Sequence, residues 1–162
     1  MRKVTILAVL ATLAAAGCGG GGGSGGIANF VGDWDYSAGS ITQTCQGAIP
    51  TSTSLAGYSV LISRTSNPGE IEFLSNFDGC ARYLTVSGNT ASMRSYDPLC
   101  GDRAVDQTTG EAYTLSITPL TQMLTYRGGR VMSESATNSL RYLYDDNTYI
   151  DCTSTISNAS LF

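Results

Sequence analysis

Apolar and polar residues alternate along much of the chain, most strictly in the segment 113–118, which has the sequence YTLSIT. A period of two is typical of a β-strand, whose successive side chains point to opposite faces of a sheet. The same alternation occurs in segments 58–63, 70–73 and 140–144. No window has the 3.6-residue period of an amphipathic helix. The pattern therefore predicts an all-β domain whose strands each have one buried and one solvated face.

Short turn sequences separate these strands. Asn67-Pro68-Gly69, Ser87-Gly88-Asn89, Gly128-Gly129 and Asp145-Asp146-Asn147 all carry residues that favour turns. The spacing predicts eight or nine strands, with one longer loop from Asp97 to Gly110. Sequential hairpins of this kind favour an antiparallel up-and-down β-barrel, and a β-sandwich is the alternative.

The N-terminus has a different character. Arg2 and Lys3 precede an apolar run from Val4 to Ala16, and Gly17-Cys18 follows. The run is too short for a bilayer span of about 20 residues, but it has the length of a signal-peptide core. These small residues and the cysteine resemble the lipobox of bacterial lipoproteins, although Ala15 stands where leucine is usual. An ordinary secretory signal, cleaved after residue 16 or 17, is the alternative.

The lipoprotein interpretation divides the chain into three parts. Residues 1–17 are the predicted signal peptide, and residues 18–28 hold the lipidated Cys18 and a glycine-rich linker. Such a linker behaves as a flexible coil. Residues 29–162 form the predicted single barrel domain. We expect a lipid-anchored protein of the cell envelope. The outer membrane is favoured because Gly19 follows the cysteine, in place of the aspartate that marks inner-membrane retention.

Composition argues against several activities. Beyond the predicted signal there is no histidine and no lysine, and seven arginines face thirteen acidic residues. This acidic balance argues against binding to nucleic acid or to anionic lipid. The missing histidine and lysine remove the usual activated nucleophiles and metal ligands. The acidic turn 145–151 lacks the glycine and terminal glutamate of a calcium loop. We therefore expect no enzyme activity, no metal and no cofactor.

The chain has five cysteines, and lipidation of Cys18 would leave four, an even number. In an exported protein these four are expected to form disulfides. Three pairings are possible. First and last strands are neighbours in a closed barrel, which favours Cys45 with Cys152. Cys80 and Cys100 flank one predicted hairpin, which favours their pairing.

The G-x-W sequence Gly32-Asp33-Trp34 opens the first predicted strand. It resembles the lipocalin signature and, with Gly39-Ser40, the start of avidin-type barrels. That resemblance implies that Trp34 plugs one barrel end and that a late arginine, Arg141, packs on it. A tryptophan that is simply part of the core is the alternative. No other ligand-contacting residues of avidins can be matched, so biotin binding is not expected.

Most of the mature chain also resembles a group of small cysteine-paired lipoproteins of predatory and soil δ-type bacteria. The shared pieces are a G-x-W strand that ends in cysteine, a hairpin that follows a cysteine, and a late cysteine strand. In this chain they are Trp34 to Cys45, Cys80 to Thr90, and Cys152.

These observations favour a binding module over two other classes of protein. A small barrel can bind a neutral or apolar ligand, or display a recognition surface. A structural or interaction lipoprotein of the envelope with a filled barrel is the alternative. An enzyme that uses paired carboxylates is the least favoured class. A ligand would enter at the end away from Trp34, with the 97–110 loop as lid or rim. Protein partners are not specified by the sequence.

Overall fold

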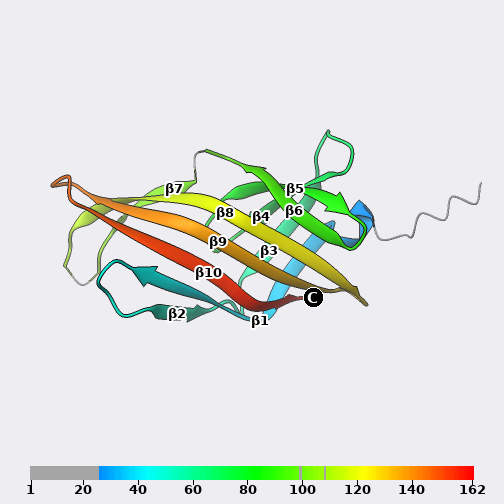
Figure 1. Cartoon of the computed structure of the whole chain (residues 1–162), viewed down its shortest axis with the longest axis horizontal. Helices are drawn as coiled ribbons and strands as arrows, with labels where there is room; N and C mark the ends of the chain where they lie inside the picture. Colours follow the sequence, from blue (N-terminus) through cyan, green and yellow to red (C-terminus); the bar gives the residue numbers. More distant parts are fainter. Residues whose placement is uncertain (1–25, 99, 108) are drawn as a thin grey trace, which may run out of the picture.

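The computed structural model describes residues 26–98, 100–107 and 109–162. In these ranges one turn of 3-10 helix, η1 (Ile27–Asn29), precedes ten strands (Figure 1). The predicted signal peptide, Cys18 and most of the glycine linker lie outside the described residues. The strands are β1 (Gly32–Cys45), β2 (Thr51–Ser54), β3 (Ser59–Arg64), β4 (Glu70–Ser75), β5 (Ala81–Ser87), β6 (Thr90–Tyr96), β7 (Gly101–Val105), β8 (Ala112–Gly128), β9 (Val131–Tyr144) and β10 (Tyr149–Leu161).

Eight strands close in a ring, because β2 and β7 stand outside it. Hydrogen-bonded neighbours follow the order β1, β3, β4, β5, β6, β8, β9 and β10, and β10 pairs again with β1. Every pair is antiparallel. The structure thus confirms the prediction of an all-β, up-and-down antiparallel sheet, which closes as a near-barrel rather than a sandwich.

The strands β2 and β7 were not predicted. The segment expected to be a loop contains β7, which pairs with β8 from Gly101↔Ser116 to Val105↔Ala112. β2 pairs with the Ser40–Gln43 part of β1. The sequences of these strands are TSTS and GDRAV, without an alternating apolar face. Hydrogen bonding to a longer neighbouring strand holds β2 and β7 in place. A search for hydrophobic periodicity does not detect strands that are stabilised in this way.

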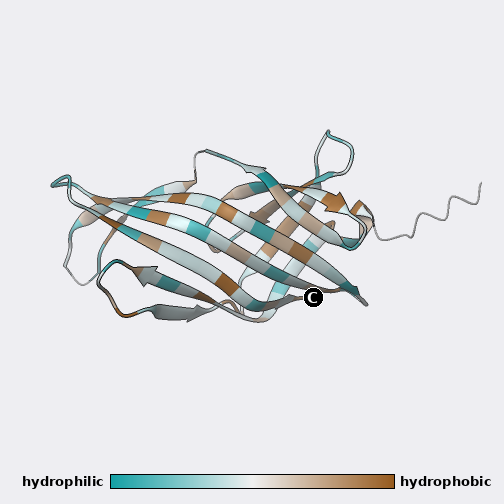
Figure 2. Ribbon diagram, in the orientation of Figure 1, coloured by the Kyte–Doolittle hydropathy of each residue, from teal (hydrophilic) through white to brown (hydrophobic). Residues whose placement is uncertain are grey.

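Strand lengths divide the domain into a closed half and an open half. β1, β8, β9 and β10 have 13 to 17 residues, whereas β3 to β6 have six or seven. β1 pairs with β3 near its start and with β2 further on, and β8 changes from β7 to β6. Figure 1 shows the long strands continuing past the short ones, with β2 and β7 beside that extension. Hydropathy alternates along the long strands (Figure 2).

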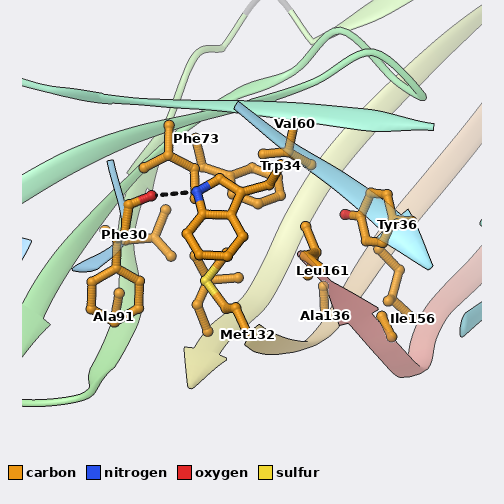
Figure 3. Packing of buried hydrophobic residues seen from close by; sticks show 14 of the residues in the cluster. Phe30, Trp34, Tyr36, Val60, Phe73, Ala91, Met132, Ala136, Ile156 and Leu161 are labelled. Atoms are coloured by element: carbon orange, nitrogen blue, oxygen red, sulfur yellow. Dashed lines mark hydrogen bonds between the residues drawn. The ribbon is translucent and has the colours of Figure 1, made fainter. Parts of the chain in front are cut away.

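Large apolar side chains fill the closed half. Trp34 is 4 % exposed, and its Nε1 donates a hydrogen bond to the Phe30 carbonyl oxygen at 2.6 Å. Figure 3 shows the indole among neighbouring core residues, with Phe30 and Met132 close to it. Phe30 follows η1 directly, so the chain covers this end of the barrel before β1 begins. The fully buried members of this core include Phe30, Ile62, Ile71, Leu84, Ala91, Leu124, Met132 and Leu161.

The arginine beside this tryptophan is Arg130, not Arg141 as expected. The Arg130 guanidinium carbon lies 5.9 Å from the centre of the Trp34 ring. Arg130 is in the β8–β9 turn, which returns the chain at the closed end. Arg141 lies eleven residues after Arg130, well along β9, and pairs with Asp151. The length of β9 therefore takes Arg141 far along the sheet from the tryptophan.

β1 and β10 approach each other unusually closely at Gly39. Both strands have register shifts there, between Tyr36 and Ser40 and between Ile156 and Ala159. Gly39 has φ +122°, and a Cβ built on it would lie 2.6 Å from the Ala159 Cα. Irregularities of this type increase local bending, which helps a sheet to close.

Candidate functional site

Three polar side chains meet at the middle of the barrel. The Tyr36 hydroxyl donates a hydrogen bond to one carboxyl oxygen of Glu134, and Gln122 Nε2 donates to the other at 2.8 Å. All three residues are buried. Burial raises the pKa of Glu134, although the hydrogen bonds from Tyr36 and Gln122 oppose the shift. Burial, together with the Glu134 charge, also raises the pKa of Tyr36. Both shifts favour the neutral forms of these groups.

A second polar network lies nearer the open half. Arg82 is 2 % exposed, and its Nη1 donates to Asp78 Oδ1 at 3.1 Å. Arg82 Nη2 also reaches Asn138 Oδ1 at 3.4 Å, and Asn138 Nδ2 donates to Ser154 Oγ at 3.1 Å. Burial acts to lower the pKa of Arg82, but the hydrogen bonds and charge of Asp78 outweigh it, and the pKa is raised. The network is therefore an ion pair that is neutral as a whole.

A hollow of about 460 Å³, here named the barrel mouth, opens beyond this network. Six polar side chains contribute to its lining, among them Asp78, Asn138 and Ser154 next to the network, and apolar side chains form the rest of the walls together with Tyr142 and two glycines. Ile117 and Leu140 face each other across the β8–β9 ladder and are 9 % and 7 % exposed. The lining side chains are Ile41, Gln43, Asn76, Phe77, Asp78, Asp102, Leu115, Ile117, Asn138, Leu140, Tyr142 and Ser154, together with Gly79 and Gly101.

A second hollow of about 470 Å³, here named the tyrosine pocket, adjoins the barrel mouth through Gln43 and Tyr142. Tyr113, Tyr142 and Tyr144 line it from β8 and β9. The Tyr142 hydroxyl is hydrogen-bonded to Gln43 Oε1 at 3.1 Å. The segment 105–107, which includes the end of β7, closes one side. The expected 97–110 rim thus borders both hollows, although part of it is a strand.

A larger hollow of about 670 Å³ lies around the exposed Arg141 and the partly buried Asp151. Arg141 Nε donates to Asp151 Oδ1 at 2.7 Å, and the Arg141 guanidinium lies 4.7 Å from the Tyr149 ring centre. The charged groups of this hollow are engaged with each other. Its other side chains are mostly serine and threonine, so it offers less apolar contact than the barrel mouth.

The cysteines behave as two different pairs. Cys45 and Cys152 are register partners in the β1–β10 ladder and form a disulfide. Cys80 and Cys100 are in one apolar cluster and share a thiol hydrogen bond, but they are not bonded covalently. The expected second disulfide is therefore absent from this structure. Neither Cys80 nor Cys100 belongs to a strand, so no ladder register fixes the distance between their Cα atoms.

The acidic turn after β9 is satisfied by protein groups. Asp145 accepts a hydrogen bond from Arg103 Nη2 at 2.8 Å, and Asp146 accepts one from the Thr148 amide at 2.8 Å. Within residues 26–98, 100–107 and 109–162, no cluster of three or more acidic, cysteine or histidine side chains could hold a metal ion. In the same ranges no helix has the length and hydropathy needed to cross a membrane.

Comparisons with known protein families, with curated proteins and with solved structures each gave no match.

The buried polar side chains of the barrel were not predicted from the sequence. Met132, Glu134, Ala136, Asn138 and Leu140 alternate along β9 and are all buried. Their spacing is a usable signal, because a polar residue in phase with apolar ones on a strand points to the same face. An inward acid or amide in such a series indicates a polar network inside the barrel.

Proposed function

We propose that this domain binds a small, mostly apolar and uncharged molecule in the barrel mouth. The observation that carries the proposal is a hollow of about 460 Å³ whose lining combines a cluster of apolar side chains with six polar ones. Small-ligand sites typically have this size and this combination of lining groups. Ile117 and Leu140 would contact the apolar body, and Asn138 would orient a polar group.

The charge at the base favours an uncharged ligand. Arg82 is already engaged with Asp78, whose side chain is 10 % exposed, so an anionic ligand would have to compete with that carboxylate, and Asp102 adds a second acidic group to the lining. Removing either charge of a buried pair is costly because the other charge is left without compensation. A ligand that accepts or donates one hydrogen bond near Asn138 avoids this cost.

The packed closed half supports a second candidate, a structural or interaction protein whose barrel needs no ligand. At that end the side chains of Trp34, Phe30 and Met132 are almost completely buried. An interior filled by its own side chains is one known arrangement of eight-stranded barrels. In the first candidate function the barrel mouth binds a small molecule, and in the second it binds none.

Binding can be tested with the neutral fluorophore N-phenyl-1-naphthylamine. We expect its fluorescence to rise on the native protein. Leu140→Trp, which fills the barrel mouth, should weaken binding about tenfold or more, since bulky side chains and ligand compete for one volume. Leu143→Trp is the matched control, because Leu143 is on the same strand but 42 % exposed. Equal binding by both folded variants, or no binding by the native protein, would favour the structural candidate.

We further propose that Cys18 carries a lipid that anchors the domain at the cell envelope, with the outer membrane favoured. Support comes from the basic, apolar and small-residue sequence that precedes it. Two or more acyl chains are needed for stable anchoring. Cys18→Ala should yield an unprocessed or soluble product. A processed Cys18→Ala protein that still sediments with membranes would refute the anchor.

A further inference from the structure

The tyrosine pocket has a composition that differs from that of the barrel mouth. Three of the nine tyrosines line it, and all three are half-buried. Tyr113 lies 5.3 Å from Tyr142 and 5.8 Å from Tyr144, measured between ring centres. The interplanar angles are 63° and 56°. Tilted aromatic contacts of this type hold rings in fixed relative positions, so the pocket wall is built from π-systems with set orientations.

The charges around this pocket favour a positive ligand. Its lining includes the carboxylate of Asp106 and no arginine. The arginines of the same half are engaged elsewhere, Arg103 with Asp145 and Arg141 with Asp151. Burial raises the pKa of Tyr144, and the negative charges of Asp106 and Glu111 raise it further. The negative charges of Asp106 and Glu111 therefore add to the negative electrostatic potential of the tyrosine ring faces.

Hydrogen-bonding groups in the pocket are largely engaged. Gln43 Oε1 is bonded to the Tyr142 hydroxyl, and Gln107 Nε2 donates to the Val105 carbonyl oxygen at 3.2 Å. Asp106 Oδ1 accepts from the Thr109 amide at 3.2 Å. A primary ammonium brings three N–H donors that would need acceptors. A fully methylated ammonium brings none and is recognised by aromatic faces and negative charge alone.

We propose that the tyrosine pocket binds an organic cation that carries a methylated ammonium group. The volume of about 470 Å³ accommodates such a group with a short chain attached. The fold already places a cation over a tyrosine in this half, where the Arg141 guanidinium lies 4.7 Å from the Tyr149 ring centre. This site adjoins the proposed site in the barrel mouth but differs from it, because Tyr113 and Tyr144 do not line the barrel mouth.

The test compares choline with 3,3-dimethyl-1-butanol, which has the same shape but carries carbon in place of the charged nitrogen. We expect titration calorimetry to give binding of choline and about tenfold weaker or undetectable binding of the alcohol, because cation–π attraction is lost. Tyr113→Leu should abolish the preference, whereas Tyr113→Phe should keep it because the aromatic face remains. Tyr83→Leu, on β5 outside the lining, is the matched control.

Several results would overturn the inference. Equal affinity for choline and the alcohol would mean that the pocket selects shape alone. No binding of choline, or full binding by a folded Tyr113→Leu protein, would exclude this site. If Tyr113→Leu does not fold, Tyr144→Leu gives the same comparison from the neighbouring strand. Binding of N-phenyl-1-naphthylamine to the barrel mouth should persist in these variants, so failure of one proposal is distinguishable from failure of the other.

Discussion

Glu134 offers the sharpest test of how the barrel interior is built. The residue is 4 % exposed, and its carboxyl group lies between Tyr36 and Gln122. Glu134→Gln replaces it with an amide of nearly the same shape. The amide oxygen can accept the hydrogen bond from Gln122, and the amide nitrogen can donate to the Tyr36 hydroxyl. The substitution therefore removes the ionisable proton while keeping the contacts.

The expected effect depends on pH in a defined direction. Burial raises the pKa of Glu134 above its ordinary value of 4.5. Between that value and the higher native pKa, the folded protein keeps a proton that the unfolded chain has lost. The free energy of unfolding then falls as pH rises, by up to about 1.4 kcal/mol per pH unit for one group. Glu134→Gln lacks this loss, so its stability relative to the native protein should increase as pH rises through this window.

Urea unfolding at half-unit pH steps from 4 to 8 measures this difference in the free energy of unfolding. The contributions of the other titrating groups are the same in both proteins and cancel in the difference. Glu70→Gln is an opposite-sign control. Hydrogen bonding from Asn67, with Thr65 and the Arg94 charge, lowers the pKa of Glu70 despite burial. That variant should lose stability near neutral pH, and the difference should vanish as pH falls through the native pKa of Glu70. A constant difference for Glu134→Gln across the range would refute the buried neutral acid.

Three further predictions concern the stability of the closed ring, each measured by urea unfolding. Gly39→Ala should cost about 2–3 kcal/mol, because the new Cβ would meet Ala159 in a strained backbone conformation, and an unchanged midpoint would contradict the close approach. Replacing both Cys45 and Cys152 by Ala should cost up to about 4–5 kcal/mol, because the bridge closes a long loop, and reduction of the native protein should match it. Trp34→Phe should cost about 2–3 kcal/mol, since it removes packing and a buried hydrogen bond, and a loss under about 0.5 kcal/mol would exclude the plug role.

Sequence alone predicts the parts of the fold that have their own local signal. The alternation in 113–118 and the turn residues at 87–89 and 128–129 correspond to β8 and to two hairpins. The partner changes of β1 and β8 could not be predicted, because they arise where long strands outlast short ones. No local pattern encodes which neighbour a strand meets at each end.

The candidate site was predictable to a smaller degree. In the folded domain Arg130 lies beside Trp34, whereas Arg141 pairs with Asp151. Sequence spacing gave no reason to expect the arginine of the β8–β9 turn, rather than the arginine of β9, beside the tryptophan. The aromatic series Tyr142 and Tyr144 on one face was visible in the sequence. Its meeting with Tyr113 required the β8–β9 register, in which Tyr113 is opposite Tyr144. The hollows exist only because the ring opens beyond the short strands.

The direction of β1 has a geometric consequence for access. The chain leaves η1 beside the closed end and runs toward Cys45 in the open half, so Ile27 lies at the end opposite the barrel mouth. A fourteen-residue strand spans about 45 Å at the usual rise. Under the anchoring proposed for Cys18, the tether would join the domain at its closed end, and the flexible glycine linker would let the domain reorient above the lipid surface. Access to both hollows from the aqueous side would stay open, because the tether joins the domain at the opposite end.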